Sequence, residues 1–399
     1  QISFGEDVIS RIMYGNSNER RNELRLKIVE DINELIQGLV KDSGVMLPDI
    51  TFIQCSGNTI MTHMLYGLDS THIRREPYIP CTAAFPVIRA SEVGIKINPR
   101  GLLGAIPCVS SYVGGDVVSD ALISGIVDSE DVSLLIDLGT NGEMVVGNSE
   151  WLVCCSASAG PCFEGVGISC GMRATTGAIE QIEFSTNGDV LEFRVVGNGK
   201  PKGLCGSGII DAVGELLRVG CIDRSGRFND DACGKRLRES ESGGREFLIF
   251  SAEKSFSGKD IVLSEADISN LIRAKGAIYN AAEALLRHMS MDFKDVKKIF
   301  LAGGFGSNLK IPQAIGIGLL PDVPIDRFLV VGNGSVQGAK AALLSREALK
   351  AMQEKVASKM TYFELSVDPI YMNEYSACLF LPHTNIEKFP SVVLPPRKH

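Results

Sequence analysis

The sequence lacks several features that would place it in a familiar class at once. Its 399 residues contain one Trp, and acidic residues outnumber basic ones by 48 to 40, a formal net charge of −8. Proteins that bind nucleic acid usually carry a basic face, so we expect no nucleic-acid partner. No apolar run approaches the roughly 18 residues of a membrane span, so we expect no membrane contact either.

Two common nucleotide-binding motifs are missing as well. No Gly-x-x-x-x-Gly-Lys-Ser/Thr sequence occurs, which excludes a P-loop NTPase. Gly206, Ser207 and Gly208 open a helix-like segment, but the third glycine of the dinucleotide fingerprint does not follow. We keep these three residues as a candidate nucleotide contact of another type.

Eleven cysteines are present, but their spacing matches no metal site. None occurs as Cys-x-x-Cys, and the one cluster, Cys154, Cys155, Cys162 and Cys170, fits neither a zinc ribbon nor a ferredoxin. A secreted disulfide framework would need denser cysteines. We therefore expect buried thiols in a reducing compartment and predict a cytoplasmic location.

The amino terminus reads like the middle of a domain. Residues 1–7 include neither an initiator Met nor a basic segment followed by an apolar one, so they do not resemble a signal peptide. We expect a fragment or a processed product with more chain upstream.

Strands and helices alternate along the chain. Apolar residues recur at helical spacing over 17–41 and, behind the capping-box pair Ser264 and Asp267, over 268–289. This alternation predicts an α/β fold with ligands at the carboxyl ends of strands. The clearest apolar strands are expected at 132–136, 298–301 and 328–331.

The most informative turn follows the first of these strands. There a carboxylate, Asp137, precedes the Gly-rich turn Gly139, Thr140, Asn141 and Gly142. Main-chain N–H groups and a Thr hydroxyl suit a phosphate oxygen, whereas Asp137 would repel it. Mg²⁺ between them removes the conflict, so Asp137 is a candidate Mg²⁺ ligand. An ordinary β-turn could use the same residues, and that alternative stays open.

A second Gly-rich turn also follows a strand. Gly303, Gly304, Phe305 and Gly306 offer a surface with few Cβ atoms, which lets a flat ring or a ribose approach the main chain. Tight packing of the strand on the next helix would need the same glycines. Asn333, in a further turn of this kind, is the last candidate for binding the nucleotide.

The order of these turns resembles the acetate and sugar kinase, heat-shock chaperone and actin (ASKHA) superfamily of ATP-binding folds. Within it, the chain resembles the ATPase module of the reductive activators of corrinoid enzymes. The segments that carry this second resemblance are 4–12, 56–63, 114–118, 159–165, 171–174, 203–211, 332–335 and 380–383.

The resemblance implies a two-lobed ASKHA ATPase fold that is incomplete at its amino terminus. Family members have a first phosphate-binding hairpin before the position of Phe4, so we expect this chain alone to bind nucleotide weakly or not at all. The implied regions are the remainder of the first lobe with a connecting helix at 1–130, a second, nucleotide-binding lobe at 131–345 with a polar insertion near 223–258, and a carboxyl-terminal segment at 346–399 that packs back on the lobes.

The resemblance also implies a function. Family members use ATP and Mg²⁺ to support reduction of a corrinoid protein from Co(II) to Co(I) for methyl transfer, with an electron from an iron–sulfur cluster on a separate upstream domain. They also suggest a homodimer. Glu143 and Glu164 are candidate catalytic residues beside Asp137, because either could orient water; surface salt bridges would explain them equally well.

Two alternatives remain open. A small-molecule kinase on the same fold would transfer phosphate to a sugar or carboxylate without a protein partner. A nucleotide-free scaffold or binding module would keep the fold without turnover. For an activator, the expected partner surfaces are the small-residue loop 156–171 and the insertion at 223–258.

Overall fold

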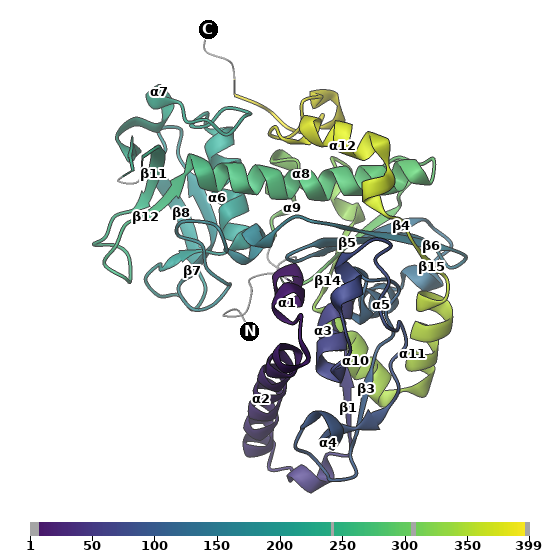
Figure 1. The fold of residues 1–399 in the computed structure, drawn as a ribbon. Coiled ribbons are helices and arrows are strands. Elements are labelled where there is room, and N and C mark those ends of the chain that lie inside the picture. The colour runs from purple at the N-terminus through teal and green to yellow at the C-terminus, as the bar shows by residue number, and fades with distance from the viewer. Residues whose placement is uncertain (1–7, 241–242, 305–308, 396–399) are drawn as a thin grey trace. The chain divides into compact units, whose positions relative to one another are not determined.

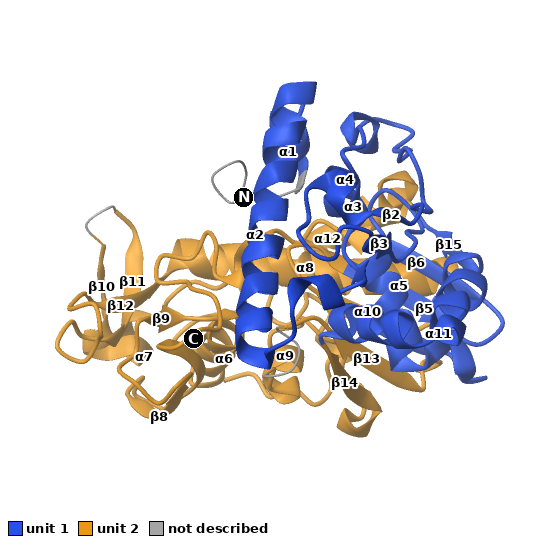
Figure 2. Cartoon of the chain, turned by 90° about the horizontal axis from the view of Figure 1, so that it is seen from below, with its two compact units in different colours: residues 1–135, 143–155, 333–363 blue, residues 136–142, 156–332, 364–399 orange. Residues whose placement is uncertain are grey.

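The computed structural model describes residues 8–240, 243–304 and 309–395. The chain divides into two compact units, coloured separately in Figure 2, and each unit is assembled from three separated segments of chain. The segments are 1–135, 143–155 and 333–363 in unit 1, and 136–142, 156–332 and 364–399 in unit 2.

The long helix of unit 1, α2 (Asn18–Ser43), has ends that follow from its sequence. Ser17 caps it by accepting a hydrogen bond from the main-chain N–H of Arg20. Gly44 ends it in the left-handed conformation with φ of 74°. The helix predicted for 17–41 is therefore confirmed. Its buried face joins a core with Leu65 of α3 (Thr59–Tyr66) and Leu103 of β3 (Leu102–Ala105).

Two other helices of unit 1, α5 (Gly115–Ser124) and α10 (Gly334–Leu344), approach closely at glycines. A Cβ atom on Gly338 would lie 2.3 Å from the Cβ of Ser119. Side chains at this position would therefore push the two helices apart. The remaining elements of unit 1 are α1 (Val8–Tyr14), η2 (Leu47–Asp49), β1 (Phe52–Cys55), α3 (Thr59–Tyr66), η3 (Thr71–Arg74), β2 (Ile88–Arg89), α4 (Ala90–Val93), β3 (Leu102–Ala105), η4 (Ile126–Asp128), α11 (Arg346–Ala351), the π-helical turn η9 (Met352–Ala357) and β15 (Met360–Tyr362).

Three strands contain residues of both units, because the chain changes unit within them. They are β4 (Ser133–Leu138), β5 (Gly142–Gly147) and β6 (Leu152–Ala157).

Unit 2 is built around two buried helices, α6 (Gly206–Arg218) and α8 (Glu265–His288). The predicted capping box at the start of α8 is confirmed: Ser264 accepts from the main-chain N–H of Asp267, whose carboxylate accepts from the N–H of Ser264. Helix α6 packs against β7 (Ala178–Phe184).

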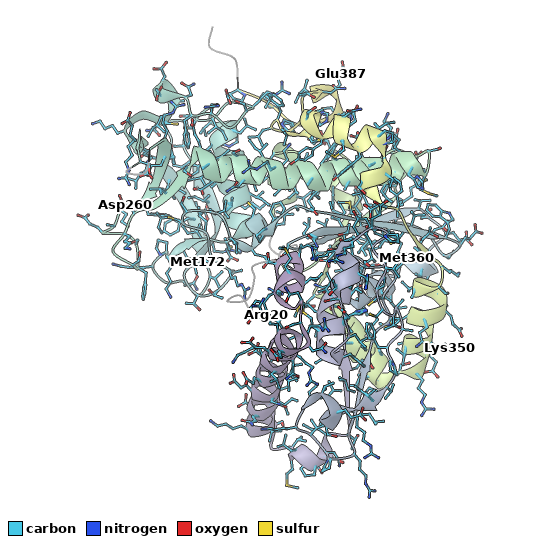
Figure 3. All side chains as sticks on the ribbon, in the orientation of Figure 1. Arg20, Met172, Asp260, Lys350, Met360 and Glu387 are labelled. Atoms are coloured by element: carbon cyan, nitrogen blue, oxygen red, sulfur yellow. The ribbon has the colours of Figure 1, made fainter. Side chains whose placement is uncertain are left out.

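Three sets of strands accompany these helices, the second of them as part of a six-stranded sheet. Strand β7 pairs with β8 (Val190–Val195) and β9 (Gly203–Leu204), and β13 (Lys298–Ala302) runs parallel to β14 (Phe328–Gly332). The polar segment 223–258 contributes two strands of the third set. Next to this third set, Asp260, labelled in Figure 3, forms an ion pair with Arg238 at 2.8 Å. The strands of this set are β10 (Leu237–Glu239), β11 (Arg245–Phe250) and β12 (Ile261–Ser264).

The last segment of unit 2 lies along α8, as Figure 1 shows for α12 (Pro369–Tyr375). The fully buried Lys275 of α8 donates hydrogen bonds to the carbonyl oxygens of Phe380 and Pro382, both at 2.5 Å. Burial lowers the pKa of this amine to about 7. The other elements of unit 2 are η5 (Pro161–Glu164), α7 (Asp230–Cys233), η6 (Gly234–Arg236), α9 (Ile311–Gly316), η8 (Ile325–Arg327), η10 (Leu365–Val367), η11 (Ser376–Cys378) and η12 (Ile386–Lys388).

Within the described ranges, no helix is both long and apolar enough to span a membrane. Eight of the eleven cysteines are buried, and all eleven are free thiols.

Candidate functional site

The two Gly-rich turns singled out in the sequence meet within unit 2. Asp137 is the penultimate residue of β4, and Gly303 follows β13. A Cβ atom on Gly303 would lie 2.6 Å from Oδ1 of Asp137 and 2.8 Å from the carbonyl oxygen of Leu138. Gly303 also has φ of 89°, a conformation that favours glycine. Glycine at this position therefore lets the second turn approach the carboxylate directly.

The second turn is open on its other side. The N–H of Gly303 donates to the carbonyl oxygen of Gly332 at 3.0 Å, which fixes the start of the turn. Gly304 is exposed, and a Cβ atom there would meet no atom of the described residues within 4 Å. Contact of this glycine with a ring or a ribose stays a prediction. Phe305 and Gly306, predicted for the same role, lie outside the described residues.

The turn after Asp137 has a second carboxylate beside it. The hydroxyl of Thr140 donates a hydrogen bond to Oε1 of Glu164, the last residue of η5. The N–H of Gly139 donates to the carbonyl oxygen of Asn141 at 3.0 Å, so the turn is internally braced. Gly142 is buried at the start of β5.

These oxygen donors fit Mg²⁺ only if a phosphate completes the coordination. Carboxylate and hydroxyl oxygens suit this ion, which commonly takes one or two carboxylates together with phosphate oxygens and water. Across the described ranges, no group of three or more His, Cys, Asp or Glu side chains is arranged to hold a metal. Mg²⁺ binding by Asp137 stays a prediction.

The third predicted contact, Gly206, Ser207 and Gly208, is buried at the start of α6. A Cβ atom on Gly208 would lie 2.0 Å from the carbonyl oxygen of Ile179 in β7, so close packing alone requires this glycine. Helix α6 also packs against η5, which carries Glu164. Nucleotide contact by these residues stays a prediction.

Two other predicted residues belong to unit 1. Asn333 is exposed, and its side-chain oxygen caps α10 by accepting from the N–H of Val336 at 3.0 Å. Glu143 is the half-buried second residue of β5.

A site residue that was not predicted from the sequence is Asp211, a carboxylate of α6 that is only 1% exposed. Its Oδ2 atom pairs with Nζ of Lys310 at 2.8 Å and accepts from the N–H of Ile182 at 3.4 Å. Burial raises the pKa of this carboxyl, and the Lys310 ammonium opposes the rise. An acid in an otherwise apolar stretch of helix was the only sequence signal for it.

Glu215, one helical turn further along α6, is a second buried acid that the sequence analysis did not single out. Its carboxylate accepts from the N–H of Phe184 at 3.2 Å, from Gln313 at 2.8 Å and from Arg218 at 2.7 Å. Burial alone would raise the pKa of Glu215, but these hydrogen bonds outweigh it and lower the pKa.

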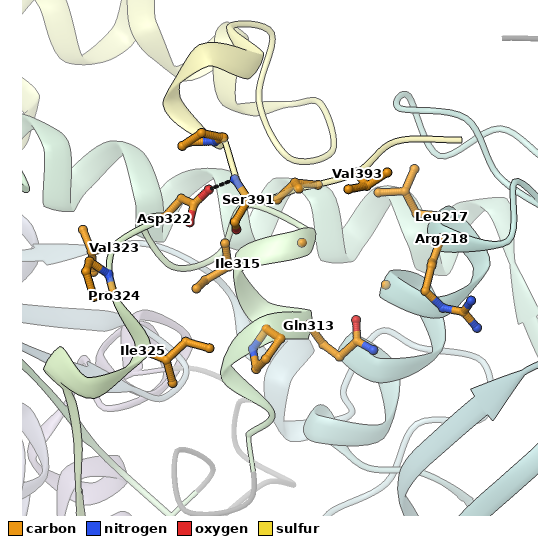
Figure 4. Close-up of a pocket in the computed structure, with 15 residues that line it drawn as sticks. Leu217, Arg218, Gln313, Ile315, Asp322, Val323, Pro324, Ile325, Ser391 and Val393 are labelled. Carbon is orange, nitrogen blue, oxygen red and sulfur yellow. Dashed lines mark hydrogen bonds between the residues drawn. The ribbon is translucent and has the colours of Figure 1, made fainter. Parts of the chain in front are cut away.

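A cavity of about 590 Å³ lies beyond this acid, between α6, α9 and the segment around Ser391 (Figure 4). Its polar groups already have partners: Arg218 and Gln313 bind Glu215, and Asp322 accepts from the N–H of Ser391 at 2.7 Å.

Two family models match the chain. The model described as the C-terminal, ASKHA domain of RACo matches residues 131–393, and the model of the RACo middle region matches residues 1–129.

Individual relatives agree with these matches. Corrinoid activation enzyme RamQ of Eubacterium limosum is 34% identical over 382 residues, which cover 94% of this chain and 64% of RamQ. A Co(II) methylated amine-specific corrinoid protein reductase of Methanosarcina barkeri is 25% identical over 296 residues, 69% of this chain and 50% of that protein.

A solved structure is also similar over nearly the whole chain. A reductive activator for a corrinoid, iron–sulfur protein has 46% sequence identity and a TM-score of 0.93, and the match covers 98% of this chain and 62% of that one. The chain therefore spans less than two thirds of the length of each of these relatives.

Proposed function

The chain belongs to the RACo family, and from this premise we propose that it is the ATPase part of a protein that activates a corrinoid protein by reduction from Co(II) to Co(I). The observation that carries the proposal is the approach of Gly303 to Asp137. It brings a carboxylate suited to Mg²⁺ and a main-chain surface suited to a nucleoside to one place.

In this proposal each turn has its own task. The turn between Gly139 and Gly142 receives phosphate oxygens, with the Thr140 hydroxyl exchanging its hydrogen bond to Glu164 for one to phosphate, and Asp137 holds Mg²⁺ directly or through water. Gly303 and Gly304 receive the ribose or base. Glu164, released from Thr140 in this way, would orient a water molecule.

ATP would act by shifting populations between conformations of the protein. A ligand that binds one conformation more tightly raises its share, and the corrinoid partner would respond to that conformation. The electron would come from an iron–sulfur cluster outside this chain.

The loop 156–171 and segment 223–258 are the surfaces we propose for the partner. In the loop, the main-chain N–H of Ser169 donates a hydrogen bond to the carboxylate of Asp267 at 2.8 Å. We also propose that the protein is cytoplasmic and that it forms a homodimer.

The test uses the full-length protein with Asp137→Asn. We expect ATP hydrolysis stimulated by the corrinoid protein, and the Co(I) absorbance that it supports, to fall by about 100-fold, because the Mg²⁺ ligand loses its charge. Asp131→Asn is the matched control, since Asp131 is an exposed carboxylate shortly before β4. Both variants should melt like the wild type.

Three results would contradict the proposal. Asp137→Asn could keep wild-type turnover, or wild-type ATPase could ignore the corrinoid protein. Alternatively, turnover could depend on a small sugar or carboxylate, which would favour the kinase alternative.

A further inference from the structure

The loop that follows Glu164 is attached to the beginning of α8 at two places. The side-chain amide of Asn270, in the second turn of α8, donates a hydrogen bond to the carbonyl oxygen of Gly167 at 2.7 Å. About one helical turn earlier, Oδ1 of Asp267 accepts from the main-chain N–H of Ser169 at 2.8 Å and from its hydroxyl at 3.1 Å. Helix α8 thus holds both ends of a short segment of this loop.

The chain between Glu164 and this segment is itself tightly wound. The N–H of Val166 donates a hydrogen bond to the carbonyl oxygen of Pro161 at 3.2 Å, back across the turn that contains Glu164. A Cβ atom on Gly165 would lie 2.4 Å from the main-chain nitrogen of Met172, so neighbouring backbone encloses this glycine. The position of Glu164 therefore depends on where α8 holds the loop beyond it.

Binding of a nucleotide would remove the side-chain hydrogen bond that fixes this carboxylate in the structure. Oε1 of Glu164 accepts from the hydroxyl of Thr140, which in the proposed function turns to phosphate. A carboxylate that orients water must nevertheless keep its place, because a displacement of about 1 Å can cost about 100-fold in rate. That place then comes from the main chain of η5 and from the loop that is attached to α8.

We propose that Asn270 is a positioning residue for ATP hydrolysis: by holding Gly167 it keeps Glu164 where this carboxylate can orient the attacking water. The inference rests on the proposed ATPase function and on the task proposed there for Glu164. Asn270 acts on Glu164 through the loop between them. Its effect should therefore appear in kcat and not in the affinity for Mg-ATP.

Asn270 is the better of the two attachment points to change. Asp267 also accepts from the N–H of Ser264 in the capping box of α8, so its loss would weaken the helix itself. Asn270 has a different second contact, because its side-chain oxygen accepts from the exposed Arg273. In Asn270→Asp an oxygen remains for Arg273, whereas the donor to Gly167 becomes a carboxylate oxygen, which repels the carbonyl group.

The experiment measures kcat and KM of ATP hydrolysis with and without the corrinoid protein, Mg-ATP affinity by calorimetry, and thermal melting, all on the full-length protein. For Asn270→Asp we expect kcat to fall about tenfold in both conditions, while KM and Mg-ATP affinity stay within about twofold of wild type. Asn270→Ala, which removes the donor without adding a charge, should show the same difference between kcat and KM.

Glu164→Gln provides a second readout, because a purely structural role of Asn270 would not depend on the carboxylate of Glu164. Glu164→Gln alone should lower kcat by at least as much as Asn270→Asp does. In the double variant, Asn270→Asp should cause no further loss of kcat, since both changes act through the same carboxylate.

Asn22→Asp is the matched control. Asn22 lies on α2 of unit 1, and its side-chain oxygen accepts a hydrogen bond from Arg25 at 2.6 Å, as that of Asn270 does from Arg273. The substitution therefore makes the same chemical change beside an arginine at the same helical spacing. We expect wild-type kcat, KM and melting temperature.

The outcomes separate the two claims. A full-length wild-type protein that hydrolyses no ATP overturns the proposed function and this inference with it. Wild-type kcat in Asn270→Asp, a further loss in the double variant, or a loss of Mg-ATP affinity as large as the loss of kcat overturns the inference alone. A loss that appears only with the corrinoid protein present also overturns it, because Asn270 would then act on the partner surface of the loop 156–171.

Discussion

At the scale of single residues, two adjacent glycines have different tasks. Gly303 has a positive φ and lies against Asp137, whereas Gly304 has open space where a side chain would be. The sequence predicted both as parts of one turn, because Gly-Gly after a strand is a local signal. It could not predict which glycine faces the carboxylate, because Asp137 is far away along the chain.

The two glycines provide a matched pair of substitutions. Gly303→Ala should lower the free energy of unfolding by about 1–3 kcal/mol, because the residue is held at φ of 89° and its Cβ would meet Oδ1 of Asp137. Gly304→Ala should change it by less than about 1 kcal/mol. Urea titration measures both, and equal effects would contradict the assigned geometry.

At the scale of elements, local signals predicted helices better than they predicted pairings. Both ends of α2 and the start of α8 follow from caps that lie within a few residues of each helix. The parallel pairing of β15 with β6 joins distant segments, and no pattern in either short strand indicates its partner. From the sequence we expected residues 346–399 to pack back on the lobes, but for the same reason no pattern identified α8 as a contact of the carboxyl-terminal segment.

That attachment includes His383, which is 2% exposed and packs near Tyr279 and Phe389. Burial, together with the charges of Lys388 and Lys275, lowers the pKa of His383 to about 4. In the unfolded chain a histidine takes up a proton near pH 6.5. The stabilising contribution of the neutral ring is therefore complete above pH 6.5 and is lost as the pH falls toward 4.

His383→Gln tests this pH dependence. The amide cannot take up a proton but keeps an acceptor for the N–H of Asn385, which Nδ1 of His383 now accepts at 3.0 Å. Urea midpoints at pH 7, 5.5 and 4.5 should fall less steeply for the variant than for the wild type. Equal falls for the variant and the wild type would show that folding does not change the pKa of His383 in this pH range.

At the scale of the whole molecule, the resemblance found in the sequence is confirmed for the family and the ASKHA fold. The sequence also named both turns of the site, because each follows a buried strand. It missed the buried carboxylate Asp211, because a partner such as Lys310 is recognisable only after the chain has folded. The residue roles at the site remain predictions.

Removal of 364–399 tests the division into units. Without these residues the ring of Tyr279 loses its contact with Phe389, and Lys275 loses both carbonyl partners. Hydrogen exchange measured by mass spectrometry should therefore show α8 unprotected. Peptides from α2 of unit 1 are the internal reference in the same sample, and unchanged protection of α8 would contradict the prediction.

Because the segments of the two units alternate along the sequence, neither unit can finish folding early in synthesis. Unit 1 lacks α10 and β15 until residues 333–363 have been made, and unit 2 lacks the cover of α8 until 364–399 follow. Neither unit can be complete before these late segments have been made, so apolar surface that they cover stays exposed on the nascent chain until synthesis of this region is almost finished. Chaperones that bind apolar segments should therefore have a long period in which to engage it.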